Sequence, residues 1–95
     1  MILSITKSAR QFGYVIWSSK TNAMMKELIG DCSEIAVSFN GFSIGVKSVD
    51  WKYHRISIGY KFTRALPETA KVYNLTFHDN VLEVNASNVT RPPIT

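Results

Sequence analysis

The stretch EIAVSFNGFSIGV, residues 34–46, alternates apolar with small or polar side chains on both sides of the dipeptide Asn40-Gly41. Two-residue hairpin turns favour this dipeptide, because both of its residues tolerate a positive φ. A turn at this point pairs the apolar residues of one face with one another: Phe39 with Phe42, Val37 with Ile44, and Ile35 with Val46. The stretch therefore predicts an antiparallel hairpin with one buried face.

Further elements are expected on both sides of this hairpin. Residues 1–6 and 12–17 are β-prone, and residues 7–11 between them are expected to form a turn or loop. The run 12–17 is apolar on both faces, which is typical of a central strand or of one in an interface. Residues 23–29 predict a helix of barely two turns, which Gly30 ends as a left-handed cap. Alternation then continues from residue 49 to 62 with a turn or bulge at His54-Arg55, and residues 66–69 break it. A second hairpin is expected at residues 79–80, pairing Phe77 with Leu82 and Leu75 with Val84.

The 95 residues fit one domain, and we expect a fold that is mostly β, or α+β with one short helix, built as a small antiparallel sheet or barrel of hairpins. Residues 1–84 are predicted to form a single compact β-rich domain, and the polar residues 85–95 a flexible C-terminal tail. The single Cys32 cannot form an internal disulfide, and the N-terminal apolar run is too short for a signal peptide or a membrane span. We therefore expect a cytoplasmic protein with no membrane partner.

The net charge of +4 is concentrated in one segment, which we call the basic segment, residues 47–64. It holds five cations and one carboxylate, which account for the whole net charge, interleaved with four aromatic residues: Trp51, Tyr53, Tyr60 and Phe62. This composition suits contact with a phosphate backbone, and it equally fits a half-solvated strand with its rings in the core. We expect these four rings to lie in the core. If they were exposed, they could stack on unpaired bases.

Groups for catalysis or metal binding are few. Cys32, His54, His78 and seven carboxylates do not stand at spacings typical of a nucleophilic or zinc site. Cys32 follows a predicted helix end, where the helix dipole disfavours a thiolate, so we expect a half-buried thiol. The sequence therefore predicts no enzyme activity, no metal and no cofactor.

Residues 9–39 resemble the swapped-hairpin domain of the AbrB/MazE/SpoVT type. That pattern joins a strand with a central Gly, a short helix with a Gly turn, and a second alternating strand; the matching residues are Arg10, Gly13 to Ile16, Met25 to Asp31 and Glu34 to Phe39. Tyr14 stands where the family usually has Arg or Lys, and Trp17-Ser18 where it usually has an apolar residue and Pro. The resemblance implies an obligate homodimer with interleaved hairpins, which meets DNA through Arg10 and its neighbours Lys7 and Lys20.

These features favour a small homodimeric nucleic-acid-binding protein, a DNA-binding transcription regulator or antitoxin-like module that acts through a basic strand face. The predicted nucleic-acid-binding residues are Lys7, Arg10, Lys47, Lys52, His54, Arg55, Lys61 and Arg64. Base reading is assigned to Arg55, Arg10 or His54. The alternative is a non-enzymatic protein-interaction module, such as an accessory or inhibitor protein of a mobile element, with no nucleic-acid role. Its signature would be an exposed Trp17 or Trp51.

Overall fold

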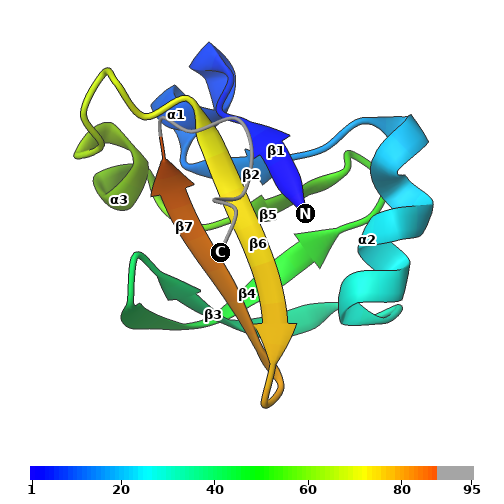
Figure 1. The fold of residues 1–95 in the computed structure, drawn as a ribbon. Coiled ribbons are helices and arrows are strands. Elements are labelled where there is room, and N and C mark those ends of the chain that lie inside the picture. Colours follow the sequence, from blue (N-terminus) through cyan, green and yellow to red (C-terminus); the bar gives the residue numbers. More distant parts are fainter. Residues whose placement is uncertain (88–95) are drawn as a thin grey trace, which may run out of the picture.

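Residues 1–87 are described by the computed structural model of the chain, and they form a seven-stranded sheet with three short helices (Figure 1). In chain order the elements are β1 (Ile2–Ser4), α1 (Lys7–Phe12), β2 (Tyr14–Ile16), α2 (Asn22–Ile29), β3 (Glu34–Phe39), β4 (Phe42–Asp50), β5 (Arg55–Ser57), α3 (Tyr60–Arg64), β6 (Val72–His78) and β7 (Val81–Ser87). The sheet, in the order β1-β6-β7-β3-β4-β5-β2, curls into a nearly closed barrel. The mostly β prediction is confirmed. The sheet is mixed and not purely antiparallel, because β3 and β7 run parallel.

The hairpin of β3 and β4 forms at the expected turn but in a different register. Asn40 and Gly41 both adopt a positive φ, and Phe39 pairs with Phe42 as predicted. A β-bulge then shifts the remaining partners by one: Val37 faces Gly45, and Ile35 faces Lys47. The pairs predicted for Ile44 and Val46 are therefore wrong, and Val46 is 61% exposed.

The second hairpin, of β6 and β7, has the predicted turn and register. Asp79 and Asn80 adopt positive φ values, and the partners are as expected: Leu75 with Val84 and Phe77 with Leu82. β7 continues through Ser87, so residues 85–87 belong to the sheet and not to a tail. The rest of the expected tail, residues 88–95, lies outside the described residues.

Two helices stand where the sequence predicts other structure, whereas α2 is confirmed. Gly30 ends α2 with a φ of 77° and a ψ of 174°, which is not the predicted left-handed cap. The predicted loop at residues 7–11 is α1, which begins where the Thr6 hydroxyl accepts the Ala9 N–H at 3.0 Å and ends at Gly13, whose φ is 80°. The predicted strand through Phe62 ends at Ser57, and the chain continues into α3. None of the helices among residues 1–87 is long and apolar enough to span a bilayer.

Side chains that alternate along the strands fill the interior. The largest fully buried side chains include Tyr73, Met25, Ile56, Ile58, Leu75 and Leu82. The Tyr73 hydroxyl has no hydrogen-bond partner among the described residues. Burial raises the pKa of Tyr73 to about 12, although the positive charge of Arg10 acts in the opposite direction.

Candidate nucleic-acid interface

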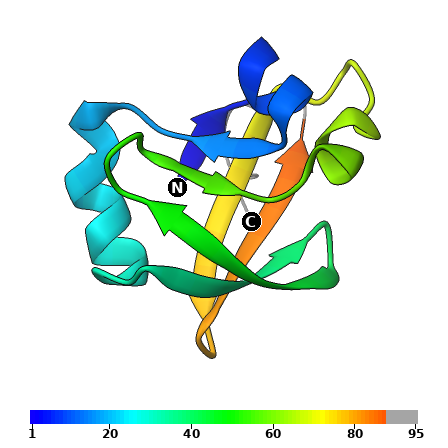
Figure 2. The same ribbon diagram turned by 180° about the vertical axis from the view of Figure 1, so that it is seen from behind.

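The basic segment follows one side of the barrel through four different pieces of structure. It runs along the end of β4, through a turn at residues 51–54, along β5 and into α3. Figure 2 shows β4, β5 and β2 together in front of β6 and β7, with α3 beyond one end of β5. Four of its five cations, Lys52, Arg55, Lys61 and Arg64, therefore lie at the two ends of this short strand.

Arg55 is the centre of the cluster on the outer face of β5. Its guanidinium carbon lies 4.4 Å from the centroid of the Tyr14 ring and 5.1 Å from that of Tyr53. The Arg55 Nε lies 3.9 Å from a carboxylate oxygen of Asp50. Arg55 faces outward because the next residue, Ile56, is fully buried and successive strand residues face opposite sides. Two rings and one carboxylate therefore position the guanidinium.

The turn before β5 projects a tyrosine from the barrel. His54 adopts a φ of 56°, and the Tyr53 N–H donates to Asp50 Oδ1 at 3.0 Å. The Lys52 ammonium lies 5.4 Å from the centroid of the Tyr53 ring, which is 58% exposed as a residue. Tyr53 thus offers an accessible ring with two cations close to it.

A second ring and cation pair lies on α3. The guanidinium carbon of Arg64 is 4.7 Å from the centroid of the Tyr60 ring, and its Nε donates to the Gln11 carbonyl of α1 at 3.0 Å. Lys61 is exposed beside them, and Tyr60 and Phe62 are 51% and 40% exposed. This helix therefore repeats the combination of ring and guanidinium found around Arg55.

The exposure of Tyr53, Tyr60 and Phe62 corrects the expectation that these rings lie in the core. The helical turn of α3 points Thr63 inward instead, where it is fully buried and its hydroxyl donates to the Arg10 carbonyl at 2.7 Å. The condition for stacking on unpaired bases, an exposed ring beside a cation, is met by Tyr53 and Tyr60, whereas Phe62 packs on the buried Phe39 with ring centroids 6.1 Å apart.

The Arg10 side chain is held by the loop that follows α3, and its backbone carbonyl accepts the Thr63 hydroxyl of that helix. Its guanidinium donates to the carbonyls of Leu66, Pro67 and Ala70 at 2.9, 3.1 and 2.6 Å. These bonds fix the loop between α3 and β6, which gives Arg10 a structural role, and its predicted contact with a base stays a prediction.

The other predicted contacts are scattered. On β4, Lys47 lies on the same face as the buried Val49, which is the face opposite to that of Arg55. Lys7 is exposed on α1, and His54 is a half-buried turn residue whose carbonyl accepts the Trp17 N–H at 3.0 Å. Four of the eight predicted residues therefore lie around β5: Lys52, Arg55, Lys61 and Arg64. Sequence reasoning missed Tyr14, which carries no charge and was noted only as a departure from the family pattern.

The tryptophans do not form an exposed patch. Their rings pack edge to face with centroids 5.7 Å apart. The indole N–H of Trp17, which is buried, donates to Asn22 at 2.9 Å, and that of the half-buried Trp51 donates to the Cys32 carbonyl at 2.6 Å. The exposed tryptophan expected for the interaction-module hypothesis is therefore not observed. The half-buried state of Cys32 is as expected.

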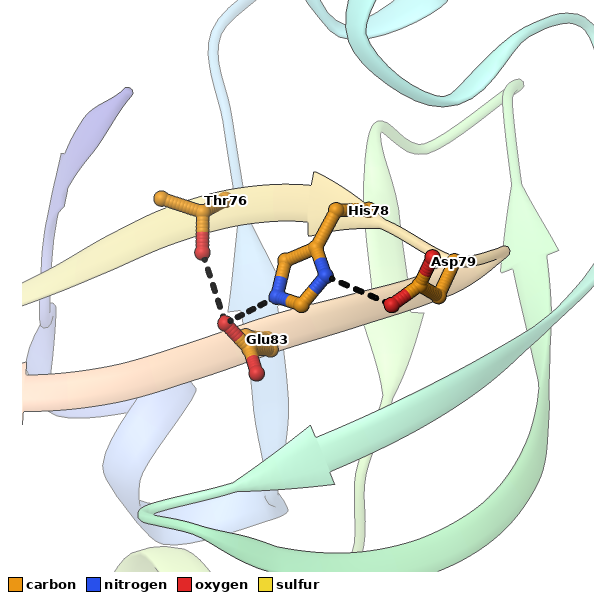
Figure 3. Close-up of polar contacts among 4 residues, drawn as sticks. All are labelled: Thr76, His78, Asp79 and Glu83. Atoms are coloured by element: carbon orange, nitrogen blue, oxygen red, sulfur yellow. Dashed lines mark hydrogen bonds and ion pairs between the residues drawn. The ribbon is translucent and has the colours of Figure 1, made fainter.

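A polar cluster at the tip of the second hairpin was also missed (Figure 3). The Nδ1 of His78 lies 3.2 Å from a carboxylate oxygen of Asp79, and its Nε2 lies 3.1 Å from a carboxylate oxygen of Glu83. The same Glu83 oxygen accepts the Thr76 hydroxyl at 3.1 Å. The hydrogen bond to Asp79, and to a smaller extent that to Glu83, raises the pKa of His78. The pairing of Thr76 with Glu83 across the hairpin could have indicated it.

Comparison of the chain with protein-family models, curated proteins and solved structures found no match. The resemblance to the swapped-hairpin family stays a prediction. Among residues 1–87, no three His, Cys, Asp or Glu side chains stand together as a metal site would require.

Proposed function

We propose that this protein binds single-stranded nucleic acid over the outer face of β5 and its flanks. The observation that carries the proposal is the Arg55 cluster, in which a fixed guanidinium lies between Tyr14 and the exposed Tyr53. A phosphate can accept from the guanidinium while a base stacks on the exposed part of the Tyr53 ring. The second pair, Tyr60 and Arg64, supplies the same combination beyond the other end of the strand.

The exposed rings favour unpaired bases over a duplex. Bases in a duplex already stack on one another, so aromatic side chains gain stacking energy only from bases that are free, at about 1–3 kcal/mol per base. The expected role as a transcription regulator or antitoxin-like module would act on duplex DNA. The surface supports the prediction of nucleic-acid binding, but its exposed rings favour single-stranded over duplex nucleic acid.

Fluorescence anisotropy tests the proposal with a labelled single-stranded DNA of roughly 12–16 nucleotides and the corresponding duplex, each at low and at physiological salt. We expect tighter binding of the single strand. The double variant Lys52→Ala/Arg55→Ala should lower the slope of log K against log salt by about 1.4, because each phosphate contact contributes roughly 0.7.

The matched control is Lys26→Ala/Lys71→Ala, which removes the same charge from exposed positions outside the basic segment. It should leave the slope nearly unchanged. An equal decrease of this slope in both double variants would mean that binding depends only on net charge. Absence of binding at low salt would refute the proposal.

A further inference from the structure

The seam of the barrel is a groove between two strand edges. β1 and β2 end the strand order, and each pairs with only one neighbour in the described sheet. The groove has a volume of about 450 Å³ and lies between Ile2, Leu3 and Ser4 on one side and Ile16, Trp17 and Ser18 on the other. The two edges of the sheet thus line one cavity of the size that binds small ligands.

The backbone of β1 faces this groove at every second residue. Met1 exchanges two hydrogen bonds with Leu75, at 2.7 and 2.9 Å, and the Ile5 N–H donates to the chain before β6 at 2.8 Å. Residues of an antiparallel pair alternate between bonding their neighbour and facing away from it. Ile2 and Ser4 therefore direct their N–H and C=O groups away from β6.

The same alternation holds on β2. The Gly13 carbonyl accepts the Ile58 N–H at 2.7 Å, and the Trp17 N–H donates to the turn before β5 at 3.0 Å. Tyr14 and Ile16 therefore direct their backbone groups away from β5. Within residues 1–87, neither edge has a further strand partner on its open side.

We propose that the groove binds an extended, uncharged segment of a partner protein, which adds a strand at the seam. Alternating N–H and C=O groups along an edge are complementary to an extended polypeptide backbone, and such edges bind peptides by strand addition. Among residues 1–87 the lining includes no charged side chain, which favours an uncharged segment. The buried Leu3 and Trp17 provide apolar contact, while Ser4 and Ser18 provide hydroxyl groups.

The test begins with selection of a phage-displayed random peptide library against the full chain. We expect enriched peptides that are uncharged and that, as synthetic peptides, slow hydrogen exchange at the amides of Ser4 or Ile16. Failure to enrich any peptide, or protection elsewhere only, would overturn the proposal. So would a free dimer in which these amides are already protected, since a second copy would then occupy the seam.

Two substitutions separate backbone pairing from side-chain contact. Ser4→Pro removes the N–H that faces the groove, at an edge position where proline is tolerated, and Ser4→Thr keeps it. The selected peptide should bind Ser4→Pro at least about tenfold more weakly than Ser4→Thr. Equal affinities would exclude a contribution from this amide. If Ser4→Pro does not fold, hydrogen exchange on the unmodified chain decides.

Discussion

Arg55 stacks on Tyr14 of the neighbouring strand, with its guanidinium carbon 4.4 Å from the centre of the ring. The contact is diagonal, because Tyr14 pairs with Ser57 and Arg55 with Ile16. A carboxylate oxygen of Asp50 lies 3.9 Å from the Arg55 Nε, and the centroid of the Tyr53 ring lies 5.1 Å from the guanidinium carbon. The cation is therefore positioned before a ligand arrives, which lowers the entropic cost of binding it.

Replacement of Tyr14 tests the stack. Tyr14→Leu removes the ring and should weaken single-stranded DNA binding roughly two- to fivefold, the value of one exposed cation–π contact. Tyr14→Phe keeps the ring and should bind like the unmodified protein. Anisotropy titrations measure both affinities, and an equal loss in both variants would assign the effect to the hydroxyl.

Arg10 is expected to matter for stability and not for nucleic-acid binding. Arg10→Met leaves the carbonyls of Leu66, Pro67 and Ala70 without their charged donor and should lower the free energy of unfolding by about 2–4 kcal/mol. Arg10→Lys should recover only part of this, because lysine lacks the planar fork. Urea denaturation measures the change. Normal stability with lost DNA binding would contradict this role.

The hydroxyl of Tyr73, which has no hydrogen-bond partner within residues 1–87, predicts a stabilising substitution. Tyr73→Phe removes this buried polar atom and should raise the free energy of unfolding by about 1 kcal/mol. The pKa of Tyr73 is raised to about 12, so the unfolded chain ionises first and stability falls as the pH rises from 10 to 12. Denaturation across this range should show a smaller fall for Tyr73→Phe. A destabilised variant would indicate a partner for the hydroxyl.

The His78 cluster predicts a local pH dependence. Hydrogen bonds to Asp79 and Glu83 raise the pKa of His78 in the folded protein. The contribution of His78 to stability is therefore complete below pH 6.5 and is lost as the pH rises through the raised pKa. NMR titration should place this pKa above 6.5. The variant Asp79→Asn/Glu83→Gln should return it toward 6.5, and an unchanged value would assign the shift to another cause.

Gly13 and Gly45 form a matched pair of glycines with positive φ. A Cβ on Gly13 would collide with the backbone of Gly59 and Tyr60, whereas Gly45 has open space around it. Gly45→Ala should cost about 1 kcal/mol of backbone strain, and Gly13→Ala clearly more, because α1 and α3 must then separate. Thermal unfolding compares the two, and equal costs would mean that the helices adjust freely.

Local signals in the sequence were sufficient for the two hairpins and for α2. The dipeptide Asn40-Gly41 and the pair Asp79-Asn80 tolerate positive φ, and alternating residues such as Leu75 and Val84 determine which face is buried. The concentration of cations at residues 47–64 was equally visible, because charge can be counted without coordinates.

Tertiary structure decided the register beyond the bulge, the helices α1 and α3, and which cations are available. The charge of Arg10 alone does not show that three carbonyls of a distant loop surround it. Nor does alternation show that the chain leaves the sheet after Ser57, so that Tyr60 is exposed and Thr63 is buried. These outcomes depend on contacts between residues far apart in the sequence, whereas turns and strand faces are fixed by the conformational preferences of neighbouring residues.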